Sequence, residues 1–204
     1  MEKQILIPFP VPTSSVIAYH QDDPYKVSLI EQAKKHRCRL TLIGGRCELP
    51  GQSHETCIQE EWVQEAGGKG AELTFLTYFL TKNDRFADPR EVTLGKLTSG
   101  KCPQELIDLP VLGLYGSPDA IYMARVKGTP YPNDGEAKQC IWFDVRELVI
   151  TETADESKFG AQHDLLLGLY RRFLDRKFQG THEMLTDMND LRRSLLQIQA
   201  DGWK

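Results

Sequence analysis

The sequence has no apolar run near the roughly 20 residues that a membrane-spanning helix requires. Its first residues also lack the charged-then-apolar pattern and the small-residue cleavage site of a signal peptide. We therefore expect a cytoplasmic protein that does not work in a membrane.

Cysteine is scarce and is not arranged in pairs. The chain of 204 residues has five cysteines, an odd number with no C-x-x-C spacing, at Cys38, Cys47, Cys57, Cys102 and Cys140. That spacing excludes a structural zinc knuckle and disfavours a disulfide framework. We expect reduced thiols.

An excess of positive charge is also missing. Lysine and arginine total 25 against 29 aspartates and glutamates, so the formal net charge is -4. Proteins that coat nucleic acid or anionic membranes carry the opposite balance. The charge therefore disfavours nucleic acid or an anionic membrane as the main partner, and it leaves a local basic patch open.

Short β-branched and aromatic segments predict strands along most of the chain. They lie at 14–19, 26–31, 39–43, 73–80, 91–97, 120–126 and 140–145. The first two are separated by a turn-like segment and suggest a hairpin. The segment 73–80 is apolar throughout and predicts a strand buried on both faces.

Three segments have helical periodicity. The first, 53–66, begins at the capping residue Ser53 and stops at Gly67-Gly68. The others are 164–177 and 183–200. Strands first, one helix between strands and helices last predict an α+β or α/β sandwich. The apolar stripe of the last helix would either pack on the domain or form a homodimer.

The segment from Gly44 to Gly68 carries the candidate chemistry. It reads as a strand, a glycine-rich loop and an acidic helix, with Glu61 and Glu65 four residues apart on one helix face. Two carboxylates with backbone carbonyls from a tight loop suit Mg²⁺ or Mn²⁺ better than zinc. The alternative is an ordinary solvated face of a surface helix.

This segment resembles the box of the Nudix hydrolase family, G-x5-E-x7-R-E-U-x-E-E-x-G-U. Gly45 takes the first glycine, and Glu61, Glu65 and Gly67 match later positions, with one extra residue in the loop. The stretches 134–148 and 159–176 resemble the acidic loop, the Trp-Phe strand and the closing helix of ADP-ribose-type members. The resemblance covers roughly residues 12–178.

The resemblance implies a Nudix-type α/β/α sandwich with a mixed central sheet. It divides the chain into a Nudix-like domain at 1–178 and a C-terminal helical extension at 179–204, which packs on the domain or on a partner subunit. It also implies a metal-dependent pyrophosphohydrolase that cleaves a nucleoside diphosphate linked to another moiety, such as an ADP-ribose-like or dinucleotide substrate.

The resemblance further assigns residues to roles. Glu61 and Glu65 would be catalytic and would bind Mg²⁺ or Mn²⁺, with Gln64 and Gly45 as further metal ligands. Substrate-binding candidates are Arg46, Asp134, Glu136 and Arg90. Each of these has a simpler reading, because arginines pair on surfaces and acids are common in solvated turns.

Three departures from the box favour a second reading. Glu60 replaces the family's arginine, Gln52 replaces its usual glutamate partner, and Gln64 replaces the first of the paired acids. The surroundings of the retained glutamates must therefore be built differently, and metal affinity should fall. The alternative is a catalytically impaired Nudix-fold protein that binds or senses a nucleotide.

Overall fold

The computed structural model describes residues 12–32, 39–47, 51–82, 86–87, 92–93, 103–108, 110–111, 115–116, 118–133, 135, 137–178, 184–185 and 187–204. The longer strands are β1 (Thr13–His20), β2 (Lys26–Gln32), β4 (Ile43–Arg46), β5 (Glu72–Lys82), β10 (Asp119–Lys127) and β11 (Ala137–Asp144). The short strands are β3 (Leu40–Thr41), β6 (Phe86–Ala87), β7 (Val92–Thr93), β8 (Pro110–Val111), β9 (Tyr115–Gly116) and β12 (Met184–Leu185). The helices are α1 (His54–Glu65), α3 (His163–Leu174) and α4 (Met188–Ala200), with 3-10 turns η2 (Gln104–Leu106) and η3 (Val145–Glu147).

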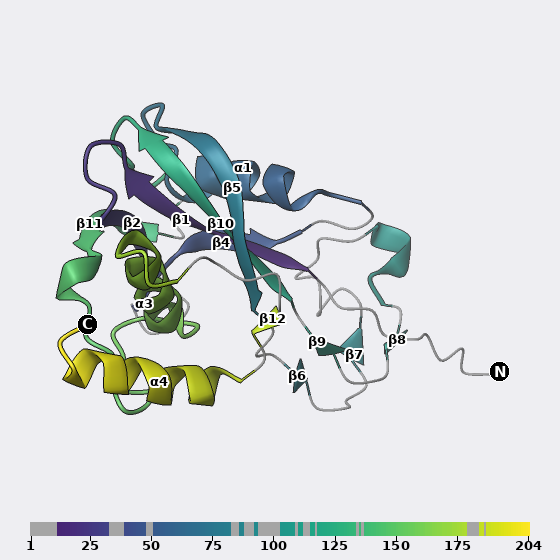
Figure 1. Cartoon of the computed structure of the whole chain (residues 1–204). Helices are drawn as coiled ribbons and strands as arrows, with labels where there is room; N and C mark the ends of the chain where they lie inside the picture. Colours follow the sequence, from purple (N-terminus) through teal and green to yellow (C-terminus); the bar gives the residue numbers. More distant parts are fainter. Residues whose placement is uncertain are drawn as a thin grey trace.

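A mixed eight-stranded sheet forms the centre of the molecule (Figure 1). Its main order is β11-β2-β1-β10-β5-β12, with β3 beside β2 and β4 beside β1. β1 runs parallel to β10 over its whole length, from Thr13 opposite Asp119 to His20 opposite Val126. Its other edge is shared by β2 and β4, both antiparallel, so the expected hairpin of the first two strands is present.

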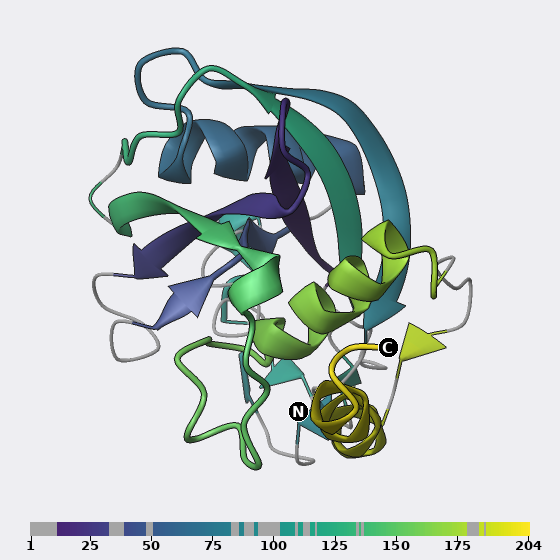
Figure 2. The ribbon, with the colours of Figure 1, turned by 60° about the vertical axis from the view of Figure 1, so that its left-hand side comes forward.

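Helices cover both faces of this sheet. α1 lies on one face and α3 on the other, and α3 separates the sheet from α4 (Figure 2). The alternation of β1 explains the two cores, because Val16 and Ala18 pack with Ile58 and Trp62 of α1 whereas Ile17 faces the α3 side. The expected α/β/α sandwich with a mixed sheet is confirmed.

The C-terminal segment differs from its prediction as a single helix from 183 to 200. Met184 and Leu185 form β12, which pairs in parallel with the end of β5, and the helix begins only at Met188 after the cap Asp187. α4 packs on α3, where Leu195 lies against Gly168 and Arg192 forms a buried ion pair with Asp164. No helix in the described residues is long and apolar enough to cross a membrane.

The central part of β5 also differs from its prediction, because it is not buried on both faces. Phe75 is 68% exposed and has a positive φ of 56°, and Tyr78 is also exposed. The pairing with β10 shifts register twice in this region. These bulges turn side chains outward that a regular strand would bury.

The predicted strand at 39–43 divides into β3 and β4, and Gly44-Gly45 lies within β4 rather than after it. Of the strand predicted at 91–97, the described residues show only β7.

Candidate functional site

Helix α1 holds the two candidate acids, Glu61 and Glu65, at adjacent turns of its inner face. The Ser53 hydroxyl caps the helix by accepting a hydrogen bond from the Thr56 backbone N–H at 3.1 Å. Glu61 and Glu65 are 9% and 4% exposed, although the same helix has a solvated side. The simple reading of these acids as a solvated face therefore does not describe their position.

The two glycines of β4 lie directly against these carboxylates. A Cβ atom on Gly45 would be 1.9 Å from Oε1 of Glu61, so only glycine leaves room for the carboxylate. The Gly44 backbone N–H donates to Oε2 of Glu65 at 3.2 Å. Strand β4 thus leaves room for the Glu61 carboxylate at Gly45 and holds the Glu65 carboxylate by a hydrogen bond from the Gly44 backbone N–H.

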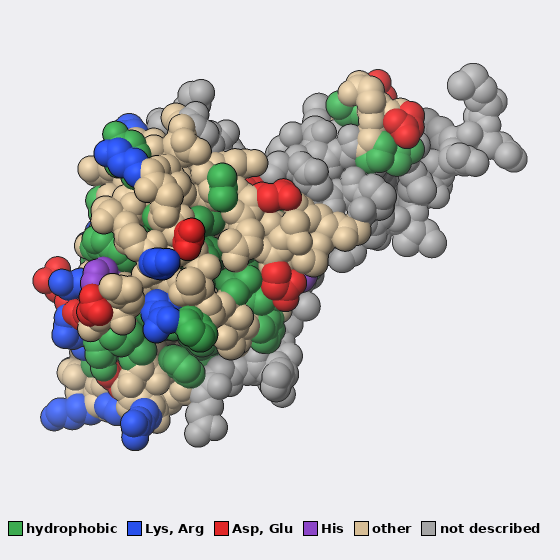
Figure 3. All heavy atoms as spheres, turned by 90° about the horizontal axis from the view of Figure 1, so that it is seen from above, with side chains coloured by type: hydrophobic (Ala, Val, Ile, Leu, Met, Phe, Trp, Pro, Cys, Tyr) green, Lys and Arg blue, Asp and Glu red, His purple; other side chains and the backbone are tan. Residues whose placement is uncertain are grey.

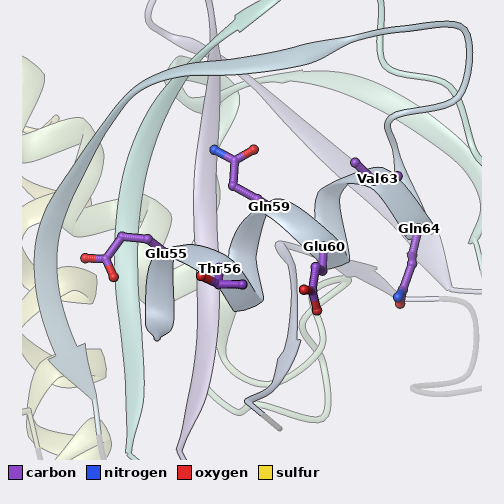
Figure 4. A pocket seen from close by; sticks show the side chains of 6 residues that line it. All are labelled: Glu55, Thr56, Gln59, Glu60, Val63 and Gln64. Carbon is purple, nitrogen blue, oxygen red and sulfur yellow. The ribbon is translucent and has the colours of Figure 1, made fainter. Parts of the chain in front are cut away.

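Gln64 lies apart from the two acids, on the exposed side of α1. There a groove of about 540 Å³ is lined by Glu55, Thr56, Gln59, Glu60, Val63 and Gln64. In Figure 4, the side chains of Glu60 and Gln64 extend in the same direction from the helix, whereas Gln59 extends in the opposite direction. The structure therefore brings Glu61, Glu65 and Gly45 together and leaves Gln64 outside that group.

Two of the three altered box positions, Gln52 and Glu60, contact each other. The Gln52 amide donates to Oε2 of Glu60 at 2.6 Å on the exposed side of the helix. In the family, an arginine and a glutamate at these two positions would form an ion pair. Here the Gln52 amide and the Glu60 carboxylate form a hydrogen bond instead. It connects the loop before α1 to the second turn of the helix, one residue before Glu61.

The donor set fits a hard divalent cation. Mg²⁺ is commonly held by one or two carboxylates together with phosphate oxygens of a substrate, and Glu61 and Glu65 provide two carboxylates. Within the described part of the chain, no group of three histidines, cysteines or acids is placed to hold a metal ion. Arg46 is half-buried in β4, beside the two glycines. Asp134, Glu136 and Arg90 lie outside the described residues.

The structure also shows a polar cluster that the sequence reading missed. The Ser14 hydroxyl lies 2.7 Å from Nδ1 of His54 and 3.3 Å from Sγ of Cys47, and Cys47 Sγ is 3.7 Å from the same histidine nitrogen. No sequence motif marks this cluster, because Ser14 reaches it from a strand 40 residues away from His54.

The surroundings of the cluster shift the pKa values of Cys47 and of Cys57, in the first turn of α1, in opposite directions. A hydrogen bond from Cys57, with further ones from His54 and Ser14, lowers the pKa of Cys47 although burial opposes this. The bond to Cys47 and then burial raise the pKa of Cys57. The bond to Cys47 also raises the pKa of His54.

A family model described as "NUDIX domain" matches residues 11–163. No curated protein matches the chain.

Several solved structures share the fold at low sequence identity. A NUDIX hydrolase from Nitrosomonas europaea is 14% identical with a TM-score of 0.56, over 89% of this chain and 82% of that one. The NUDIX domain of Shewanella oneidensis NrtR, solved with ADP ribose, is 11% identical with a TM-score of 0.53, over 81% and 88%. A MutT protein from Methanosarcina mazei is 11% identical with a TM-score of 0.51, over 84% and 99%. Because these identities are between 11% and 14%, the similarity shows a shared fold and does not show a shared substrate.

Proposed function

The chain belongs to the Nudix family, and we propose that it is a metal-dependent pyrophosphohydrolase that cleaves a nucleoside diphosphate linked to another moiety. The observation that carries the proposal is the burial of Glu61 and Glu65 against the glycines of β4. Burying two carboxylates costs free energy unless they are paired or bind a cation, so a purely solvated role does not explain them.

Glu61 and Glu65 would hold Mg²⁺ or Mn²⁺, with the backbone of Gly45 beside them and Gln64 as a weaker candidate. When bound, such an ion makes a water more acidic and offsets the negative charge of phosphate oxygens. The protein's own contribution is orientation, because the Gly44 N–H fixes Glu65 and the glycine seat limits where Glu61 can lie.

Glu61 is the proposed base, and one of its carboxylate oxygens would take the proton of the attacking water. Arg46 would bind a phosphate of the substrate through its guanidinium group. Asp134, Glu136 and Arg90 remain proposed substrate contacts.

The proposed substrate is ADP-ribose-like or a dinucleotide. The NrtR domain that shares this fold was solved with ADP ribose, which supports this class of ligand. On the face shown in Figure 3, basic side chains are interspersed with acidic and apolar ones rather than gathered in one patch. This supports a small nucleotide-derived ligand over nucleic acid.

We also propose that the protein acts in the cytoplasm and away from membranes. Residues 1–178 would form the Nudix-like domain and 179–204 its helical extension, which packs on that domain. A homodimer is a further proposal.

A nucleotide sensor without hydrolytic activity is the second candidate. It is favoured by the Gln52–Glu60 contact in place of an ion pair and by the position of Gln64 on the exposed face. Gln64 carries no charge, so it would hold a cation more weakly than an acid at that position.

A comparison of turnover by the wild-type protein and by Glu65→Gln tests the proposal. ADP-ribose, NADH, dinucleoside polyphosphates and nucleoside triphosphates would be incubated with Mg²⁺ or Mn²⁺, and nucleotide and phosphate release measured. We expect hydrolysis of at least one diphosphate compound, and a loss of about 10²–10⁴-fold in Glu65→Gln, typical of removing a group that acts in the reaction. Glu72→Gln, at an exposed acid near Lys127, is the matched control and should retain activity.

Absence of turnover across the panel would contradict the hydrolase. Calorimetric binding of one of the same compounds by the inactive protein would then support the sensor.

A charge exchange tests the altered pair. In Gln52→Glu a second carboxylate would face Glu60 across a contact of 2.6 Å, and the amide donor would be lost. Because partners of catalytic groups typically change activity 10–100-fold, we expect kcat to fall about 10-fold. The double variant Gln52→Glu/Glu60→Arg restores an ion pair and should recover the loss. A double variant no better than the single one would show that this contact does not support the site.

A further inference from the structure

The chain that leads to Gly44 changes its partner strand at Leu42. Before this residue, β3 pairs with β2, where Thr41 lies opposite Ile30. After it, β4 pairs with β1. Leu42 itself belongs to neither strand and is buried, with 2% of its surface exposed. Its backbone N–H therefore needs an acceptor that neither ladder of the sheet supplies.

The imidazole of His163 is that acceptor. The Leu42 N–H donates to its Nδ1 at 2.8 Å, across 121 residues of the chain. His163 is 5% exposed and is the first residue of α3, which lies on the opposite face of the sheet from α1 (Figure 2). Because a backbone N–H can only donate, this Nδ1 is unprotonated, and the neutral imidazole carries its proton on Nε2.

Backbone hydrogen bonds fix His163 relative to the same strand. The Leu40 N–H donates to the Lys158 carbonyl oxygen at 2.9 Å, and the Leu40 carbonyl oxygen accepts from the Gly160 N–H at 2.9 Å. The Gly160 carbonyl oxygen in turn accepts from the His163 N–H at 3.0 Å. Together with the bond from Leu42, these contacts close a ring between the start of α3 and the strand that leads to the glycines.

The turn before α3 is held in an unfavourable backbone conformation. Ala161 and Gln162 have φ values of 50° and 56°, in the left-handed region that residues other than glycine rarely adopt. Nζ of the buried Lys82, at the end of β5, donates to the Ala161 carbonyl oxygen at 2.6 Å. Such conformations cost free energy, persist where surrounding contacts impose them, and gather at functional sites. This favours a role for the turn beyond connecting two elements.

The bond at Leu42 lies close to the carboxylate site. Leu42 is two residues before Gly44, whose N–H donates to Oε2 of Glu65 at 3.2 Å. That distance is at the long end of the range for N–H···O bonds, so a small shift of the strand would break it. Without an acceptor, the buried Leu42 N–H would be left unpaired, and the strand would have to shift to satisfy it.

We propose that His163 is a positioning residue for the carboxylate site. By accepting the Leu42 N–H, it sets where β4 begins and therefore where the Gly44 N–H meets Glu65. It acts on that carboxylate through the strand rather than through contact with a substrate. Its effect on turnover rests on the function proposed above, whereas its effect on the Gly44–Glu65 bond does not.

Two substitutions separate the acceptor from the volume of the side chain. His163→Asn keeps an acceptor near the position of Nδ1, whereas His163→Leu removes it and fills a similar space. We expect kcat to fall about 10-fold in His163→Leu with KM little changed, and Mn²⁺ affinity in calorimetry to fall about 10-fold, at the lower end for groups that support a metal ligand. His163→Asn should retain most of both.

Amide hydrogen exchange followed by nuclear magnetic resonance tests the same link without a substrate. The N–H groups of Leu42 and Gly44 should exchange at least about 10-fold faster in His163→Leu, relative to Ile121 in the centre of the sheet. The comparison with Ile121 removes any general loss of stability. In His163→Asn the ratio should remain close to that of the wild-type protein.

Arg192→Met is the matched control. Its partner Asp164 directly follows His163, but this ion pair joins α3 to α4 rather than to the strand at Leu42. The variant should be destabilised, yet well below its melting temperature it should keep the wild-type kcat and the wild-type exchange ratio of Gly44. If it does not fold, Asp164→Leu/Arg192→Met replaces it.

Three results would overturn the proposal. They are an unchanged exchange ratio of Gly44 in His163→Leu, an unchanged kcat in that variant, and equal losses in His163→Leu and His163→Asn. If His163→Leu does not fold, His163→Gln, whose acceptor lies one bond further out, gives the same comparison. If the protein hydrolyses none of the compounds, the hydrolase is wrong, and the exchange ratio and Mn²⁺ affinity still decide whether His163 positions Gly44 and Glu65.

Discussion

Replacing Gly45 by alanine should lower turnover about 100-fold while the protein stays folded. The added methyl group would lie 1.9 Å from Oε1 of Glu61, so the carboxylate must leave its seat. The end of a glutamate side chain can move at little cost in stability, but displacing a reacting group by about 1 Å costs about 100-fold in rate. Steady-state kinetics on the substrate identified from the panel would measure the change, together with thermal unfolding.

Gly44→Ala is the contrasting variant next to it. A Cβ on Gly44 would lie 2.1 Å from the Ser14 carbonyl oxygen and 2.6 Å from Cα of Ser15. These are backbone atoms of β1, so the strands must separate, and we expect a loss of about 1–3 kcal/mol in unfolding free energy. Equal melting temperatures for the two variants, or full activity of Gly45→Ala, would contradict the assignment of Gly45 as the seat of Glu61.

Replacing Arg192 by methionine should destabilise the fold by about 3–5 kcal/mol, because it leaves the carboxylate of Asp164 buried without its partner. The two side chains are buried and joined at 2.9 Å, and the same guanidinium nitrogen also donates to the Thr151 carbonyl oxygen at 2.9 Å. For a chain of this size the loss corresponds to a decrease of roughly 6–20 °C in melting temperature. Urea unfolding and calorimetry would measure it.

Arg193→Met is the matched control, since the adjacent arginine is exposed and contacts Asp190 on the surface of α4. Its effect should stay within about 1 kcal/mol. The double variant Asp164→Leu/Arg192→Met removes both charges and should recover most of the stability. A single variant as stable as the wild type would show that α4 does not depend on this ion pair.

Local signals explain why α1 could be predicted from the sequence. Ser53 supplies a hydroxyl to the first turn, and the glycines after Ala66 end the helix, so both limits depend on neighbouring residues alone. Glu61 and Glu65 share a face by helical geometry, wherever the helix is placed. Their burial, however, depends on Gly44 and Gly45 of a separate strand.

Other features depend on contacts between distant segments and could not be predicted. Met184 and Leu185 fit the apolar stripe of the following helix, and only the free edge of β5 makes them a strand. Phe75 has an apolar side chain in an apolar run, yet the irregular pairing with β10 exposes it. The cluster of Cys47 and His54 depends in the same way on Ser14 from β1.

The parallel pairing of β1 with β10 has a consequence for the order of folding. Ser15 and Asp119, whose side chains bond at 3.0 Å, are 104 residues apart in the chain. During synthesis, one edge of β1 therefore stays unpaired until β10 has left the ribosome. Strands in that state invite pairing with other chains, and long-range closure of this kind is slow. The hairpin of β1 and β2, which can form early, leaves the opposite edge of β1 unpaired in the nascent chain, so we expect chaperones to bind there until β10 is made.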